Sequence, residues 1–165
     1  MNKDFFKYFG FDLLGCFSEC GAKKDGILVI DNPEVLEGLL VEIAETNRLV
    51  PVSSSSEKFI PQGASALVCI AEDESQKPKV IANIGLETSH LAAHSWPESG
   101  ILQVSLYTCD KNTDGRKVMF DIWDEVGARE LVYRRIHRDG YFSADYVRRF
   151  ELDEKGRKVC AKRRI

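Results

Sequence analysis

The sequence predicts a two-layer α+β sandwich in which an antiparallel sheet carries two helices on one face. Two segments have the 3.6-residue hydrophobic period of amphipathic helices, and several short apolar segments are typical of strands. Their order, strand-helix-strand-strand, occurs twice along the chain. The 165 residues, 44% of them hydrophobic, are enough for one domain with a substantial core. We therefore expect residues 1–165 to form a single domain.

The first strand and the first helix are predicted within residues 9–47. Phe9 to Cys20 is apolar and half alternating, as in a strand, and residues 23–26 (Lys-Lys-Asp-Gly) give a turn signal. Asn32 is a favourable N-cap, Pro33 suits the first helical position, and Asn47 ends the helix. The apolar stripe of this helix consists of Leu36, Leu39, Leu40, Ile43 and Ala44.

The middle of the chain is predicted to be mostly sheet. Residues 49–60, 64–71 and 80–84 have the composition of strands, with a polar loop over 72–78. Ser89 to Ser95 and Ile101 to Tyr107 then form a hairpin. Its connection contains Pro97 and Gly100.

The second helix and three more strands complete the predicted fold. Thr113 or Asp114 can cap a helix that stops at Gly127. Its core-facing residues are Val118, Met119, Ile122, Trp123 and Val126. Strands are predicted over residues 130–137, 141–152 and 158–163. With both helices on one face, the other face of the sheet needs a cover or faces water or a partner.

Charge and cysteine content exclude several classes of partner. The net charge of −3 and the pI near 5.7 argue against nucleic-acid binding, and the basic residues 156–164 are expected to be a solvated last strand. No apolar run approaches the roughly 20 residues of a membrane helix, and the N-terminus has no signal-peptide pattern. Five cysteines without metal-type spacing indicate reduced thiols, so we expect a cytoplasmic protein.

The predicted hairpin has unusual chemistry. Residues 86–98 read LETSHLAAHSWPE, and Cys109 follows eleven residues later. A serine hydroxyl can attack the preceding peptide carbonyl and form an ester, and elimination followed by hydrolysis then leaves a pyruvoyl group at a new N-terminus. Ser89 and His94 lie an odd number of residues apart, so a regular strand places them on opposite sides. A bulge, or a position of Ser89 just before the strand, would bring them together.

Several motifs in this order resemble the prokaryotic S-adenosylmethionine decarboxylases, which are pyruvoyl-dependent enzymes made as self-cleaving proenzymes. The matching segments are Pro61-Gln62-Gly63-Ala64-Ser65, Ser89-His90-Leu91, His94-Ser95-Trp96-Pro97-Glu98 and Thr108-Cys109. The resemblance covers about the whole chain, and several ordered motifs are far more specific than one.

The resemblance implies a role for each of five residues. The chain would cut itself between Thr88 and Ser89, and Ser89 would become the pyruvoyl group that forms a Schiff base with the substrate. His94 would transfer a proton during processing, with help from Ser65. Cys109 would be the proton donor after decarboxylation, and Glu98 would bind the ribose hydroxyls.

The resemblance also implies substrate and assembly. Decarboxylated S-adenosylmethionine would donate aminopropyl groups for spermidine synthesis, and the processed protomers would form a homodimer through the uncovered sheet face. An aromatic residue near the N-terminus would stack on adenine, with Phe9 and Phe11 as candidates. Thr88 and Asp110 depart from the family pattern. Asp110 could favour a cationic amino acid, so a decarboxylase of ornithine or arginine is an alternative.

Two further alternatives are a metal site and a function without catalysis. His90 and His94 lie four residues apart and could hold zinc with Cys109 or His137, but no supporting carboxylate is evident and the resemblance explains the same residues, so we expect no metal. A homologue in which the Thr88–Ser89 bond stays intact would instead act as a binding or regulatory partner.

Overall fold

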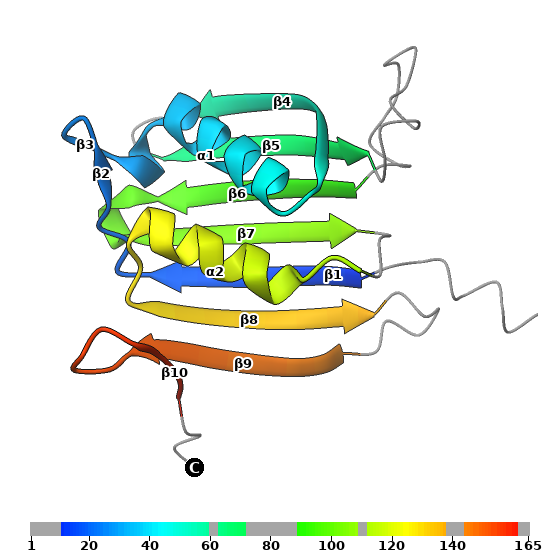
Figure 1. Ribbon diagram of the computed structural model, residues 1–165. Helices are drawn as coiled ribbons and strands as arrows, with labels where there is room; N and C mark the ends of the chain where they lie inside the picture. The colour runs from blue at the N-terminus through cyan, green and yellow to red at the C-terminus, as the bar shows by residue number, and fades with distance from the viewer. Residues whose placement is uncertain (1–10, 60–62, 72–88, 109–111, 138–143, 162–165) are drawn as a thin grey trace, which may run out of the picture.

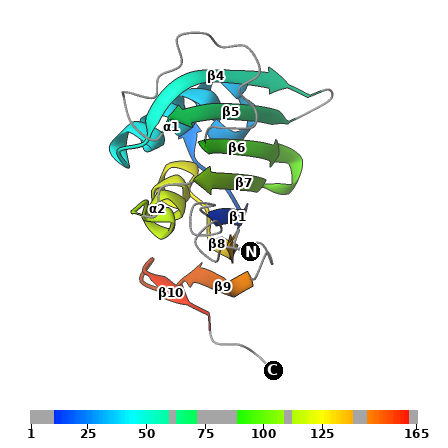
Figure 2. The same cartoon turned by 90° about the vertical axis from the view of Figure 1, so that its right-hand side faces the viewer.

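The structure is a computed structural model, and it describes residues 11–59, 63–71, 89–108, 112–137 and 144–161. These segments form two layers, a sheet and a pair of helices on one of its faces (Figures 1 and 2). The predicted fold class is confirmed.

The sheet has eight strands in the order β10-β9-β8-β1-β7-β6-β5-β4, and every neighbouring pair is antiparallel. The strands are β1 (Phe11–Ser18), β4 (Val50–Lys58), β5 (Ala64–Ala71), β6 (Ser89–Trp96), β7 (Ile101–Thr108), β8 (Glu130–His137), β9 (Ala144–Leu152) and β10 (Lys158–Cys160). The first strand of the chain is thus inserted between β7 and β8 in the middle of the sheet (Figure 1).

The helices begin and end close to their predicted bounds. α1 (Pro33–Thr46) is capped by the Asn32 side chain, which accepts the Val35 N–H at 3.1 Å. α2 (Gly115–Val126) is capped by Asp114, which accepts the N–H groups of Arg116 and Lys117. Of the two predicted caps, Asp114 is therefore the one used.

The core lies between the helices and the sheet. Every second residue of the central strands points towards the helices and is buried, and so are the apolar stripes of both helices. We call the face without helices the open face. Its strands carry exposed apolar side chains, including Leu14 (45% exposed), Leu67 (38%) and Val132 (37%).

Some predicted elements differ in the structure. The turn at residues 23–26 is part of a small hairpin of β2 (Lys23–Lys24) and β3 (Ile27–Leu28), because Asp25 and Gly26 both have positive φ. β1 ends at Ser18 rather than Cys20, since Glu19 has a φ of 53°. The last strand ends at Cys160. The strand predicted over residues 80–84 lies outside the described residues.

Candidate active site

The predicted reactive serine lies at one end of the β6–β7 hairpin. Ser89 is the first residue of β6 and is 1% exposed, on the sheet face that carries the helices. His90 pairs with Tyr107, so Ser89 and Thr108 lie together at this end of the two strands. Thr108 is also 1% exposed. We call this end of the hairpin the Ser89 end.

His94 and Ser65 lie on the open face, near the other end of the hairpin. They are direct cross-strand neighbours of β6 and β5. His94 also contacts Phe59, whose ring stacks on the imidazole with the centroids 6.1 Å apart and the planes 6° apart. The Phe59 side chain is 41% exposed. Sequence reasoning missed this residue, although it lies only two residues before the Pro61–Ser65 motif.

A buried serine holds these strands in register. The Ser95 hydroxyl accepts the N–H of Ala64 at 2.8 Å and donates to the carbonyl of the same residue at 3.1 Å. Gly63 approaches closely as well, because a Cβ on it would lie 2.8 Å from the Ser95 carbonyl oxygen. Its φ of 114° suits glycine alone. Ser95 and Gly63 therefore position Ser65 opposite His94.

The hairpin connection forms the turn end of the site. Pro97–Ser99 make the 3-10 helix η5, and Glu98 in it is exposed. Phe59, Ser65, His94 and Glu98 thus all belong to this turn end, away from Ser89.

Within one chain the two ends of the site do not meet. Ser89 and His94 lie five positions apart along a regular strand, which is about 16 Å at roughly 3.3 Å per residue. They also point to opposite faces, because β6 pairs with both neighbours without a register shift. The bulge that would have brought them together is absent from β6, and Ser89 belongs to the strand rather than preceding it.

Phe11 is not available for stacking on a nucleoside base. It is 2% exposed, and the guanidinium carbon of Arg135 lies 4.1 Å from its ring centroid. Burial in the core therefore contradicts Phe11 as a candidate. Phe9, the other candidate, lies outside the described residues, as do Thr88, Cys109 and Asp110.

The described residues contain no group of three or more His, Cys, Asp or Glu side chains placed to hold a metal. Cys109 and the His137 side chain, on which the zinc alternative depends, are outside them. His90 contacts the Tyr107 ring instead, with centroids 5.7 Å apart. The described cysteines, Cys16, Cys20, Cys69 and Cys160, are free thiols.

A family model described as S-adenosylmethionine decarboxylase matches residues 20–139, a span that includes both ends of the hairpin. The chain belongs to the S-adenosylmethionine decarboxylase family. It is therefore a carboxy-lyase by family.

Curated relatives of this S-adenosylmethionine decarboxylase family member are named S-adenosylmethionine decarboxylase proenzymes. The protein of Thermosipho melanesiensis is 31% identical over 108 residues, which are 66% of this chain and 67% of the relative. That of Thermotoga petrophila is 30% identical over 131 residues, covering 79% and 81%. That of Pseudomonas aeruginosa is 28% identical over 130 residues, covering 75% and 71%.

A solved structure supports the decarboxylase fold. The crystal structure of the adenosylmethionine decarboxylase from Aquifex aeolicus matches with a TM-score of 0.61 and 24% identity, over 79% of this chain and 91% of that one.

Among the described residues, neither helix has the length and apolar character to cross a membrane.

Proposed function

We propose that this chain is a proenzyme that cuts itself before Ser89 and then decarboxylates S-adenosylmethionine. The observation that carries the proposal is the Ser89 end of the hairpin, where Ser89 starts β6 beside Thr108 and Cys109 follows in sequence. The proenzyme names of the relatives support the cleavage step. The free thiols are consistent with a cytoplasmic location.

Cleavage uses the chain's own serine. The Ser89 hydroxyl attacks the Thr88 carbonyl carbon, its proton passes to a base, and the amide becomes an ester with a free amine on residue 89. Loss of the α-proton then breaks the ester Cβ–O bond, so that Thr88 leaves as a carboxylate and residue 89 becomes dehydroalanine. Water releases ammonia and leaves the pyruvoyl group. His94 is the base we propose for the proton transfers, with Ser65 beside it.

In catalysis the pyruvoyl group supplies an electron sink for the electron pair left by carbon dioxide. Ser89 fits as its source, because a residue at the start of a strand becomes a chain terminus without breaking the sheet ladder. Cys109 returns a proton to the α-carbon, for which a thiol with an ordinary pKa of about 8.5 is suited. Glu98 binds the ribose hydroxyls, and the exposed ring of Phe59 offers a surface for the flat base.

We further propose that the site is completed by a second copy of the chain. Ser89 and His94 of one chain are about 16 Å apart on opposite faces. A two-fold dimer through the open faces can set the turn end of one protomer against the Ser89 end of its partner. The exposed apolar side chains of the open face, with Leu14 at 45%, support this interface. Cleavage releases residue 89 from residue 88. The new N-terminus is then free to rotate at the end of β6 from the helix-covered face towards the open face.

Intact-mass spectrometry tests the cleavage. We expect a piece of 88 residues and a pyruvoyl-blocked piece of 77 residues in the wild type. Ser89→Ala should stay at full length, whereas Ser99→Ala, an exposed serine of the same hairpin, should be cut normally. A wild type that remains one chain supports a non-catalytic binding partner instead, and cleavage of Ser89→Ala would refute the assignment of the serine.

Carbon dioxide release tests the substrate. S-adenosylmethionine, ornithine, arginine and lysine are to be compared side by side with the cleaved protein. We expect release from S-adenosylmethionine. Release confined to ornithine or arginine would support the second candidate, a basic amino acid decarboxylase, which Asp110 after Cys109 favours.

Mixed dimers test the shared site. Tagged Ser89→Ala chains, which retain His94, are co-expressed with untagged His94→Ala chains, which retain Ser89. If His94 acts on its partner, the His94→Ala chain is cut in the mixed dimer and remains whole in its own homodimer. Equal failure in both dimers would place His94 and Ser89 in the same protomer.

A further inference from the structure

Four polar side chains form a row across the open face, next to the Ser89 end. Register places Cys69 beside His90, His90 beside Tyr107, and Tyr107 beside Asp12, so the row crosses β5, β6, β7 and β1. All four side chains are half-buried, on a face without helices. We call these four residues the transverse row.

The transverse row adjoins the proposed reaction centre. His90 follows Ser89 directly, and Tyr107 lies two residues before Cys109. The opposite face is filled at this end of the sheet, since Ser89 and Thr108 are 1% exposed and Phe11 is 2% exposed. We therefore expect a substrate attached at residue 89 to extend over the open face, along the transverse row.

The row combines aromatic surface with one carboxylate. The rings of His90 and Tyr107 are 5.7 Å apart and tilted by 46°, and Asp12 follows on the next strand. An aromatic surface beside a carboxylate is a favourable environment for a cation, by ring electrostatics and by charge pairing. Both candidate substrates carry a positive charge in the side chain, a sulfonium in S-adenosylmethionine and an ammonium or guanidinium in a basic amino acid.

We infer that Asp12 is a specificity-determining residue that binds the positively charged centre of the substrate's side chain, with Tyr107 and His90 as the adjoining surface. The inference rests on the proposed function, because it needs the substrate to be joined at residue 89. It assigns Asp12 to binding and leaves proton transfer to Cys109 and His94.

The test compares Asp12→Asn with the wild type. Isothermal titration calorimetry measures the binding of S-adenosylmethionine and of its uncharged thioether counterpart S-adenosylhomocysteine, and steady-state assays measure KM and kcat. We expect Asp12→Asn to weaken binding of the sulfonium compound and raise its KM by about fivefold, the size of a partly exposed charge pair. Binding of the thioether and kcat should change little, and Asp12→Glu should keep the preference for the cation. Glu125→Gln, which removes an exposed carboxylate of α2, serves as the control.

The results separate the inference from the proposed function. If Asp12→Asn affects binding of the charged and the uncharged ligand equally, or affects neither, the role of Asp12 is wrong. Decarboxylation by the wild type would still support the proposed function in that case. A wild type that is neither cut nor active on any of the substrates overturns both. If the cation is an ammonium or guanidinium, the fivefold loss appears with ornithine or arginine and not with S-adenosylmethionine.

Discussion

Ser95 connects the turn end of the site to the neighbouring strand through a single buried hydroxyl. This group is the partner of both the N–H and the carbonyl of Ala64, in the pair of strands that sets Ser65 opposite His94. A hydroxyl in this position contributes to stability and to the geometry of the two residues that we propose for processing. Its loss leaves two buried backbone groups without this partner.

Ser95→Ala should therefore lower the free energy of unfolding by about 1–3 kcal/mol, the cost of unsatisfied buried polar groups. Urea titration measures this change, and intact-mass spectrometry over time measures the rate of self-cleavage, which should fall as well. Ser99→Ala, at an exposed position of η5, is the matched control and should change the stability by less than about 0.5 kcal/mol. A Ser95→Ala protein as stable as the control would contradict this role.

Cys20 and Cys160 should differ strongly in thiol reactivity. Burial, with a smaller contribution from Cys16, raises the pKa of Cys20 to about 12, and the residue is 6% exposed. Cys160 is exposed. Since the thiolate is the reactive form, Cys160 should be alkylated by iodoacetamide first and Cys20 only on unfolding, even at pH 9. Peptide mass spectrometry after timed quenching gives the order, and fast labelling of Cys20 in the folded protein would refute it.

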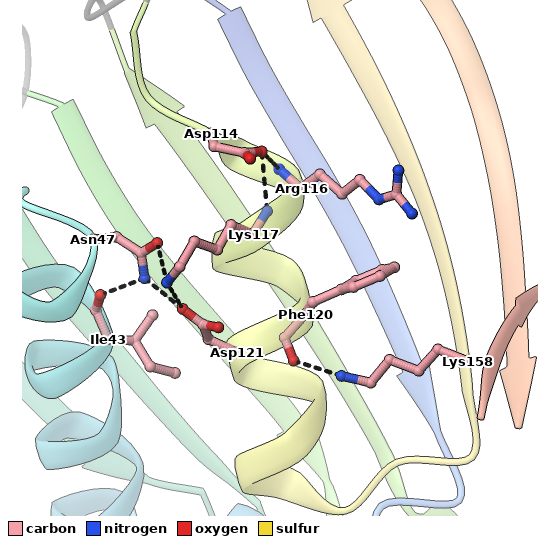
Figure 3. Close-up of polar contacts among 8 residues, drawn as sticks. All are labelled: Ile43, Asn47, Asp114, Arg116, Lys117, Phe120, Asp121 and Lys158. Atoms are coloured by element: carbon pink, nitrogen blue, oxygen red, sulfur yellow. Dashed lines mark hydrogen bonds and ion pairs between the residues drawn. The ribbon is translucent and has the colours of Figure 1, made fainter. Parts of the chain in front are cut away.

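At the scale of elements, a polar cluster joins the two helices on the face of the sheet that they share (Figure 3). Asp121 of α2 accepts hydrogen bonds from the Asn47 amide and the Lys117 ammonium, both at 2.7 Å. Asn47 also donates to the Ile43 carbonyl at the end of α1. On the other side of α2, Lys158 of β10 donates to the Phe120 carbonyl at 3.1 Å. The cluster thus links α1, α2 and the edge of the sheet.

Asp121 should make stability depend on acid pH. Burial alone would raise the pKa of its carboxyl, but the hydrogen bonds from Lys117 and Asn47 outweigh it and the pKa lies below the ordinary value. A lowered pKa in the folded state gives a stabilisation that is present above the unfolded value of about 3.9 and is lost as the pH falls through the folded value.

Asp121→Asn should accordingly cost about 1 kcal/mol of unfolding free energy at pH 7, and the difference from wild type should shrink below about pH 4. Chemical denaturation at several pH values checks both statements. Glu125→Gln on the exposed side of the same helix should show no such difference. If the difference in unfolding free energy between Asp121→Asn and the wild type stays constant down to pH 2, the carboxylate charge does not contribute to the stabilisation.

At the scale of the molecule, the proposed dimer depends on the open face. A hollow of about 360 Å³ lies on it, with Leu14, Val132 and His94 among its lining residues. Apolar side chains of this exposure on a bare sheet face are typical of an interface between subunits.

Leu14→Lys should convert the proposed dimer into a monomer and stop decarboxylation, because each active site would need both copies. Sedimentation velocity at micromolar concentration should give twice the 18.6 kDa chain mass for the wild type and a single mass for the variant. Ile27→Lys is the matched control, since Ile27 is 48% exposed and lies in the β2–β3 hairpin, at a distance from the open face. A monomeric and fully active wild type would contradict both the dimer and the shared site.

Local patterns in the sequence determined the fold class, both helices and the hairpin. The Asn32 cap, the Pro33 start and the apolar stripes act within a few residues, so they can be recognised without a structure. The period of two along a strand likewise placed Ser89 and His94 on opposite sides, as β6 has them. The family resemblance, which depends on ordered motifs, was also present in the sequence alone, and the matching family model supports it.

Only the tertiary structure decided which side of each strand is covered and which residues become neighbours. Sheet order is non-local: β1 lies between β7 and β8, and this position buries Phe11 under the Arg135 guanidinium and excludes it as a surface for a base. Cross-strand register likewise brings Ser65 to His94, and a ring contact brings Phe59 there from another part of the chain. Such contacts depend on packing between segments far apart in the sequence, for which local periodicity carries no information.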